Sequence, residues 1–171
     1  MYDHGLEDGG KNVTCVSAYG DQVLSCSDGR TGKLWAMHDS NVKLNCIGRG
    51  VHRGSVTSCA LQGRCVYTAC TDGKLVLWDG RKTDEKCLES YKDHSSDVLS
   101  IALDGAWLVS GGRDKCVCVY HVAYPNGELT LFKKFEAAKS MVRSVAVSEK
   151  LNLVMVGSDD GRIRFFNLSS E

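Results

Sequence analysis

A hydroxyl, an imidazole and a carboxylate recur together along the chain, and these are the three groups of a hydrolase that uses a serine or threonine nucleophile. One set is Thr68, His52 and Asp72. In such an enzyme the imidazole takes the proton of the hydroxyl, and the carboxylate orients the imidazole. The second set consists of Ser110, His94 and Asp114. Because an enzyme does not need a triad in every repeat of its sequence, we predict that these groups are structural.

The rest of the sequence offers no other catalytic motif. The stretches "GRGVHRG" and "SGGR" lack the spacing and the following helix of a phosphate-binding loop, and no nucleophile elbow is present. We therefore predict that the protein is not an enzyme. The sequence also indicates no cofactor.

Nine cysteines are present, with no C-x-x-C pair. Four of them (Cys15, Cys59, Cys65 and Cys70) fall within apolar, strand-like runs, which favours buried reduced thiols that act as small apolar side chains. Cys116 and Cys118 would share one face of a strand, and two thiols on one face could bind a metal ion. However, no histidine lies nearby in register. We predict no metal site. Reduced thiols favour an intracellular protein, cytoplasmic or nuclear.

The charge balance argues against two classes of partner. The chain of 171 residues has 21 basic and 21 acidic residues and no net charge, so no overall field attracts nucleic acid or an anionic membrane. No apolar stretch approaches the roughly 20 residues of a membrane span, and the polar start "MYDHGLEDGG" does not resemble a signal peptide. We expect no membrane partner and no direct binding of nucleic acid.

Short runs of Val, Leu, Ile, Thr and Cys alternate with glycine-containing turns, which predicts an all-β protein. The strands repeat. Valines that begin comparable runs recur at intervals of 42 to 44 residues: Val13, Val56, Val98 and Val142. Aromatic residues that end the third run of each unit recur at a similar interval: Trp35, Trp78, Tyr120 and Phe166.

A period of about 40 to 45 residues with four strands per unit resembles the WD40 β-propeller. The most specific copy contains "TDGKLVLWDG", with His52 in the preceding loop. The resemblance implies one WD40 domain over 1–171, with repeats at about 1–48, 49–91, 92–135 and 136–171. It implies four consecutive antiparallel blades, three complete and the last without its outer strand.

In this family a His, a Ser or Thr, an Asp and a Trp form a buried hydrogen-bonded tetrad within a blade. Grouping these polar side chains avoids leaving each one buried without a partner. Carried over residue by residue, the resemblance gives a complete tetrad in repeat 2, a tyrosine in place of the tryptophan in repeat 3, and partial sets in repeats 1 and 4. The members are His52, Thr68, Asp72, Trp78, His94, Ser110, Asp114, Tyr120, Ser25, Trp35 and Asp160.

The resemblance also implies a non-catalytic scaffold that binds proteins or peptides on the top face of the propeller. The positions that point there in the family are Asn12, Thr14, Ser55, Thr57, Thr71, Asp97, Leu99, Arg113, Met141, Arg143 and Asp159. Arg113 and Arg143 suit an acidic or phosphorylated peptide, unless they only neutralise the neighbouring aspartates. The other alternative is a WD40 subunit of a ribonucleoprotein complex.

Four blades leave an arc open, because family members usually close a ring of seven. Open flanks expose apolar side chains and an unpaired strand edge in "RIRFFNL". We expect a further polypeptide or further sequence to complete a larger ring. The alternatives are self-association into a ring of eight and a closed four-bladed monomer.

Overall fold

Antiparallel strands make up the regular structure of the chain. The computed structural model describes residues 12–38, 41–47, 51–81 and 87–168, and it contains no helix within these ranges. None of the described residues could therefore cross a membrane as a helix. The strands fall into four consecutive sheets, which confirms the all-β prediction.

Each sheet is one blade, and its strands lie side by side in chain order. Blade 1 contains β1 (Val13–Tyr19), β2 (Gln22–Ser27), β3 (Gly32–His38) and β4 (Asn41–Ile47). Blade 2 contains β5 (Val56–Gln62), β6 (Cys65–Cys70), β7 (Leu75–Asp79) and β8 (Glu89–Tyr91). Blade 3 contains β9 (Val98–Asp104), β10 (Trp107–Gly112), β11 (Cys116–Ala123) and β12 (Glu128–Glu136). Blade 4 contains β13 (Val142–Ser148), β14 (Leu153–Ser158) and β15 (Arg162–Asn167).

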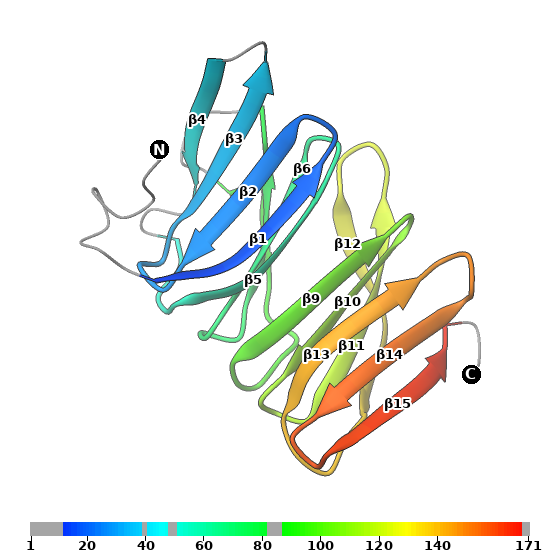
Figure 1. Cartoon of the computed structure of the whole chain (residues 1–171). Coiled ribbons are helices and arrows are strands. Elements are labelled where there is room, and N and C mark those ends of the chain that lie inside the picture. The colour runs from blue at the N-terminus through cyan, green and yellow to red at the C-terminus, as the bar shows by residue number, and fades with distance from the viewer. Residues whose placement is uncertain (1–11, 39–40, 48–50, 82–86, 169–171) are drawn as a thin grey trace.

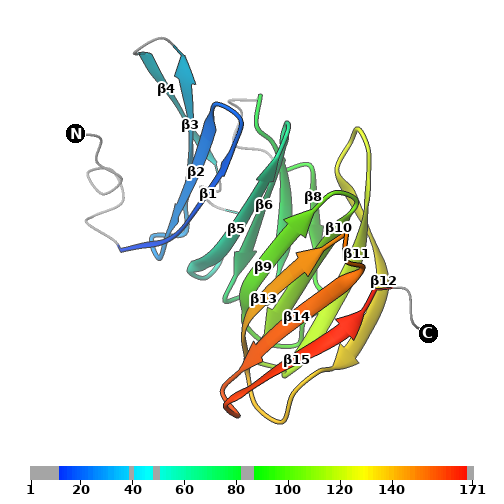
Figure 2. The same ribbon diagram turned by 45° about the vertical axis from the view of Figure 1, so that its right-hand side comes forward.

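The four sheets stack in the order of the chain, with the first strands of the blades next to one another (Figure 1). Figure 2 shows the same stack from a second direction. Within the described residues blade 4 has three strands where the other blades have four. The prediction of three complete blades and one without its outer strand is confirmed.

Tight turns join the first and second strands of each blade and need a left-handed backbone. Gly20, Gly63 and Gly105 have φ of 58, 59 and 57° in the first three blades, and Asn152 has φ of 52° in the fourth. Glycine adopts this conformation without steric cost, and asparagine tolerates it better than most residues do. Blades 1 to 3 share a two-residue turn at this place, whereas a longer turn connects Ser148 and Leu153 in blade 4.

The core lies between the blades, because each strand alternates its side chains between the two faces of its sheet. Leu24 and Cys26 of blade 1 pack with Val56 and Trp78 of blade 2. Other faces of the blades form two further clusters. Tyr67, Leu77, Leu108 and Tyr120 belong to the cluster between blades 2 and 3, and Val109, Val119, Val145 and Val156 to the one between blades 3 and 4.

Serine hydroxyls on the first strands also join neighbouring blades. Ser58 Oγ accepts a hydrogen bond from the backbone N–H of Ile101 at 3.1 Å. Ser100 Oγ accepts one from Val145 at 3.2 Å. Each bond ties the first strand of a blade to the first strand of the next.

The outer faces of blades 1 and 4 have no neighbouring blade among the described residues. On β1, Val16 is 62% exposed; on β15, Ile163 and Phe165 are 71% and 62% exposed. Phe166 points the other way, and its ring packs against that of Phe135 with centroids 4.8 Å apart. The alternation along β15 therefore places one set of apolar side chains in the core and the other in solvent.

Candidate partner-binding rim and the networks beneath it

Two loops of each blade meet at one end of the sheets: the loop that enters the first strand and the turn between the second and third strands. A backbone hydrogen bond joins them at the same place in all four blades. It runs from Asp28 N to Asn12 O (3.1 Å), Thr71 N to Ser55 O (3.0 Å), Arg113 N to Asp97 O (2.8 Å) and Asp159 N to Met141 O (3.1 Å). We call these eight residues, with Arg143, the top rim.

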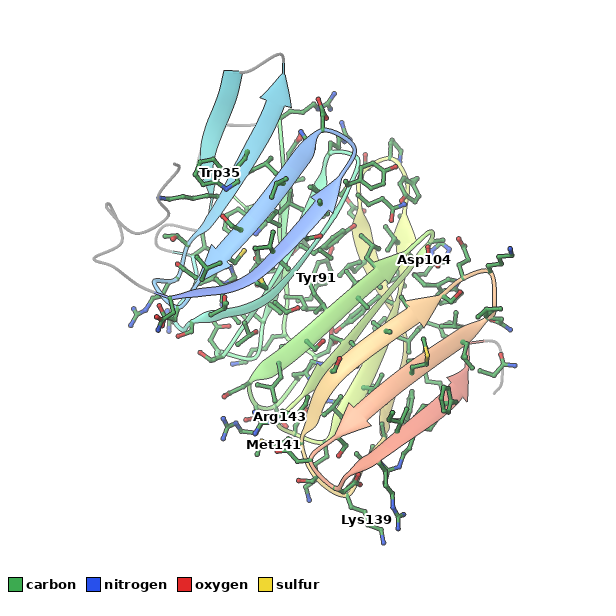
Figure 3. The ribbon with its side chains drawn as sticks, in the orientation of Figure 1. Trp35, Tyr91, Asp104, Lys139, Met141 and Arg143 are labelled. Atoms are coloured by element: carbon green, nitrogen blue, oxygen red, sulfur yellow. The ribbon has the colours of Figure 1, made fainter. Side chains whose placement is uncertain are left out.

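The top rim brings together predicted partner-binding residues from successive blades. Met141 and Arg143 lie at the end of the sheets that carries the top rim (Figure 3). Asp104, the last residue of β9 in blade 3, lies at the opposite end of the strands. Thr71, Leu99 and Met141 are half-buried. Asp28, which the sequence places one residue early for a tetrad aspartate, occupies the rim position of Thr71 and Arg113.

Blades 3 and 4 contribute two exposed ion pairs to the rim. Arg113 Nε donates to Asp97 Oδ2 at 3.1 Å, and Arg143 Nε donates to Asp159 Oδ1 at 2.8 Å. The side chains of Arg113 and Arg143 are 52% and 54% exposed. The hydrogen bond from Arg143 lowers the pKa of Asp159 below its usual value. Both arginines thus hold a carboxylate while most of the guanidinium faces solvent.

Blade 1 contributes a contact between an amide and a carboxylate to the rim. Asn12 Nδ2 donates to Asp28 Oδ2 at 3.1 Å. Ser55 Oγ of blade 2 donates to the backbone carbonyl of Asp28 at 3.4 Å. Among the described rim residues, the arginine–aspartate pairs therefore belong to blades 3 and 4, and blade 1 carries a carboxylate bound by an amide.

Thr14 and Thr57, predicted as partner-binding residues, hold blades together. Thr14 Oγ1 donates to the carbonyls of Cys26 (3.1 Å) and Val56 (2.5 Å), and the second carbonyl belongs to the next blade. Thr57 Oγ1 is placed in the same way, 3.2 Å from Ala69 O and 2.6 Å from Val98 O. The hydroxyl proton of each threonine is thus used in a bond within the fold.

Beneath the rim, blade 2 contains a buried network centred on Thr68. The indole Nε1 of Trp78 donates to Thr68 Oγ1 at 2.8 Å, and His52 Nε2 lies 2.8 Å from the same oxygen. Asp72 does not join them. Its carboxylate accepts the backbone N–H groups of Arg53 (3.2 Å) and Lys74 (3.1 Å). No partner for His52 Nδ1 is found within the described residues.

The pKa values of His52 and of the nearby Asp72 are both lowered. Burial lowers the pKa of His52 from 6.5 to about 4, against the attraction of Asp72. Burial works in the opposite direction on Asp72, but the hydrogen bond from the N–H of Arg53 and others at the turn outweigh it and lower its pKa. The imidazole is thus held neutral beside a carboxylate.

In blade 3 the histidine does contact the turn aspartate. His94 Nδ1 lies 2.9 Å from Asp114 Oδ1, and His94 Nε2 lies 2.8 Å from Ser110 Oγ. Tyr120 departs from the expected tetrad, because its hydroxyl donates to Asp93 Oδ2 at 3.1 Å. The phenol hydroxyl thus binds a carboxylate that the sequence pattern does not mark, while it also stays within reach of the Ser110 hydroxyl.

Blades 1 and 4 keep smaller networks. Trp35 Nε1 donates to Ser25 Oγ at 2.9 Å. In blade 4 the Asp160 carboxylate binds Arg164 through two bonds, of 3.0 and 2.6 Å, and also accepts the N–H groups of Lys139 and Arg162. The hydrogen bond from Arg164 holds the pKa of Asp160 well below its usual value. Arg164, which sequence reasoning missed, replaces the histidine as the partner of the turn aspartate.

Comparison with protein families agrees with this architecture. The family described as "WD domain, G-beta repeat" matches residues 3–36, 39–79, 85–121 and 129–167, which is most of the chain. The chain belongs to the WD40 repeat family.

Curated WD40 relatives are considerably longer than the chain. It is 24% identical over 172 residues to the DENN domain and WD repeat-containing protein SCD1 of Arabidopsis thaliana, which covers 96% of the chain and 14% of the relative. It is 26% identical over 170 residues to the U5 small nuclear ribonucleoprotein 40 kDa protein of Dictyostelium discoideum, covering 95% and 45%. The Arabidopsis guanine nucleotide-binding protein subunit beta is 26% identical over 126 residues, covering 68% and 33%. The chain thus spans less than half of each of these relatives.

Two computationally designed proteins share the fold. The crystal structure of Ika4 superimposes with a TM-score of 0.75 and 20% identity, over 98% of this chain and 99% of Ika4. The crystal structure of Ika8 superimposes with a TM-score of 0.73 and 20% identity, over 91% of this chain and 45% of Ika8. At this identity the likeness concerns the fold alone.

Proposed function

We propose that the chain is a non-catalytic scaffold that binds an acidic or phosphorylated segment of a partner protein at the top rim. The arrangement of Arg113 and Arg143 on adjacent blades carries this proposal. Each guanidinium is about half exposed and already holds a carboxylate through one nitrogen. A guanidinium has further N–H donors in a planar fork, so it can bind a second carboxylate or a phosphate.

Two features support a scaffold over an enzyme. The hydroxyls of the serine- and histidine-containing sets lie in buried networks, where Thr68 and Ser110 are at most 1% exposed. A nucleophile there has no access to substrate. WD40 relatives include subunits and domains of larger proteins, such as the guanine nucleotide-binding protein subunit beta.

The experiment compares two charge removals on the rim with one away from it. Arg113→Ala and Arg143→Ala should each weaken binding of a partner captured through a phosphopeptide library by roughly 10- to 150-fold, since a charge-assisted hydrogen bond contributes about 1.5–3 kcal/mol. Lys150→Ala removes an exposed charge in the turn between β13 and β14, at the opposite end of blade 4, and should leave binding unchanged. Equal binding by all three variants would exclude the rim as the site.

We also propose that further propeller blades cover the outer faces of blades 1 and 4, supplied by additional sequence or by another polypeptide. The exposed Val16, Ile163 and Phe165 support this, because apolar side chains at these places pack against a neighbouring blade elsewhere in the stack. The intracellular setting, cytoplasmic or nuclear, is part of the same proposal and follows from the unpaired cysteines.

A second candidate is a subunit of a ribonucleoprotein complex, favoured by the likeness to the U5 small nuclear ribonucleoprotein 40 kDa protein. A run of RNA would need several phosphate-binding charges along its backbone, whereas the described part of the top rim supplies two arginines, Arg113 and Arg143. Binding to a single-stranded RNA, measured across salt concentrations, distinguishes the two. Affinity that falls steeply as salt rises would favour the RNA-bound role.

A further inference from the structure

Three cysteines from three strands meet where blade 1 packs on blade 2. Cys15 lies on β1, Cys26 on β2 and Cys59 on β5. Their sulfur atoms all lie within 4.8 Å of one another, and the Cys15 and Cys59 sulfurs are 3.0 Å apart. Cys15 and Cys26 are direct partners across the β1–β2 pair, whereas Cys59 approaches from the neighbouring sheet.

The surroundings of the three sulfurs are apolar. Cys26 is fully buried and Cys59 is 8% exposed, and both belong to the cluster that contains Leu24, Leu34 and Val56. Cys15 is half-buried and opens the group to solvent on one side. The site is therefore dry on the side of Cys26 and Cys59 and accessible on the side of β1.

The spacing suits a metal ion better than a single disulfide bond. A zinc ion holds thiolate sulfurs at about 2.3 Å in a tetrahedron, which places any two of them about 3.8 Å apart. Three sulfurs within 4.8 Å need only small side-chain rotations to reach this arrangement. A disulfide would engage two of the three and leave the third sulfur beside it without a role.

We propose that Cys15, Cys26 and Cys59 bind one thiophilic metal ion, with Zn²⁺ as the natural occupant, and that this ion links blade 1 to blade 2. Thiolate ligands select soft or borderline ions such as Zn²⁺ over Mg²⁺ and Ca²⁺. Each thiol releases its proton to solvent as it binds, and the three thiolates outweigh the charge of the ion by one. The solvent side of Cys15 leaves the fourth coordination position to a water molecule.

Sequence spacing gives no sign of this site, because the ligands are separated by 11 and 33 residues and no C-x-x-C pair is present. The stacking of the blades creates the site. Cys118 provides a matched control. It is also fully buried, but it lies in the cluster between blades 2 and 3 with Tyr120 and Leu108.

The test uses the full chain, reduced and stripped of metal with a chelator. Equilibrium dialysis against Zn²⁺ should give one bound ion per chain, and Co²⁺ should produce a thiolate-to-metal charge-transfer band that Zn²⁺ removes. Zn²⁺ should also raise the melting temperature, because three thiols held together by the fold bind it more tightly than the cysteines of the unfolded chain do. Absence of saturable binding at one ion per chain would overturn the proposal.

The variants locate the ligands. Cys59→Ser should weaken Zn²⁺ binding by more than about 100-fold, since even changes outside the ligand set cost about 10- to 100-fold. Cys118→Ala should bind as the wild type does. If Cys59→Ser does not fold, Cys15→Ser, at the half-buried position, takes its place. The proposal would be overturned if a folded Cys59→Ser or Cys15→Ser variant bound Zn²⁺ as tightly as the wild type. It would also be overturned if Cys15 and Cys59 formed a disulfide and its reduction gave no Zn²⁺ binding.

Discussion

The imidazole Nδ1 of His94 lies 2.9 Å from a carboxylate oxygen of Asp114. In blade 2 the equivalent carboxylate, that of Asp72, accepts backbone N–H groups from its turn and its entering loop and lies beside the Cys70 thiol, with no hydrogen bond to His52 among the described residues. Two repeats with the same His, Ser or Thr, and Asp residues therefore differ in their hydrogen bonds. The difference concerns one connection, between the histidine and the turn aspartate.

This difference predicts unequal coupling in double-mutant cycles. His94→Ala and Asp114→Ala remove partners of one another, so their costs should be non-additive, with a coupling of about 1–3 kcal/mol. His52→Ala and Asp72→Ala should be nearly additive, within about 0.5 kcal/mol. Urea unfolding of the single and double variants measures both cycles. Equal coupling in the two blades would show that Asp72 does bind His52 in solution.

The lowered pKa of His52 predicts a loss of stability in mild acid. The folded chain binds a proton at His52 only near pH 4, whereas the unfolded chain binds it near pH 6.5. The unfolded state therefore takes up the proton first as the pH falls, and the free energy of unfolding should drop by about 1–2 kcal/mol between about pH 7 and pH 5.

The variant His52→Gln isolates this contribution. Glutamine can still hydrogen-bond to Thr68 but does not titrate, so the variant should be less stable near pH 7 and should lose less stability on acidification. Chemical denaturation at low protein concentration gives both curves. A wild-type stability that rises as the pH falls through this window would contradict the assignment.

The hydroxyl of Thr57 predicts a measurable tie between blades 2 and 3. Thr57→Val keeps the shape of the side chain but removes the donor to Val98 O, and it should cost about 1–2 kcal/mol. Thr71→Val is the control, because the half-buried Thr71 makes no hydroxyl hydrogen bond within the described residues. It should cost less than about 0.5 kcal/mol. Thermal and urea unfolding compare the two, and equal losses would remove Thr57 from the contact between blades.

Sequence predicts the strands well because their signals are local. Val13, Val56, Val98 and Val142 begin β1, β5, β9 and β13 as expected, and the expected fourth strands of the first three repeats correspond to β4, β8 and β12. Alternation of apolar residues and a turn glycine fix such elements within a few residues of chain.

Contacts between blades could not be predicted from the sequence, because the residues that make them are about 40 residues apart. The pattern marked Thr57 as a surface residue, but only the stacked structure places its hydroxyl on the carbonyl of Val98. Tyr120 was expected to act like Trp78, but its hydroxyl donates to Asp93. The hydrogen-bond partners of Thr57 and Tyr120 depend on how the surrounding segments pack, and the repeat pattern of the sequence does not specify this.

The outer face of blade 4 predicts self-association when no other blades cover it. Ile163 and Phe165 are 71% and 62% exposed on neighbouring positions of one face of β15. Burying such a side chain contributes about 1.5–3 kcal/mol, so changing both to Ser should weaken association at least tenfold. Leu151→Ser is the control, because Leu151 is 67% exposed but lies in the turn after β13. Light scattering should give the wild type a mass above 18.6 kDa that rises with concentration. A wild type that stays at that mass at every concentration would show that the exposed face of β15 does not drive association.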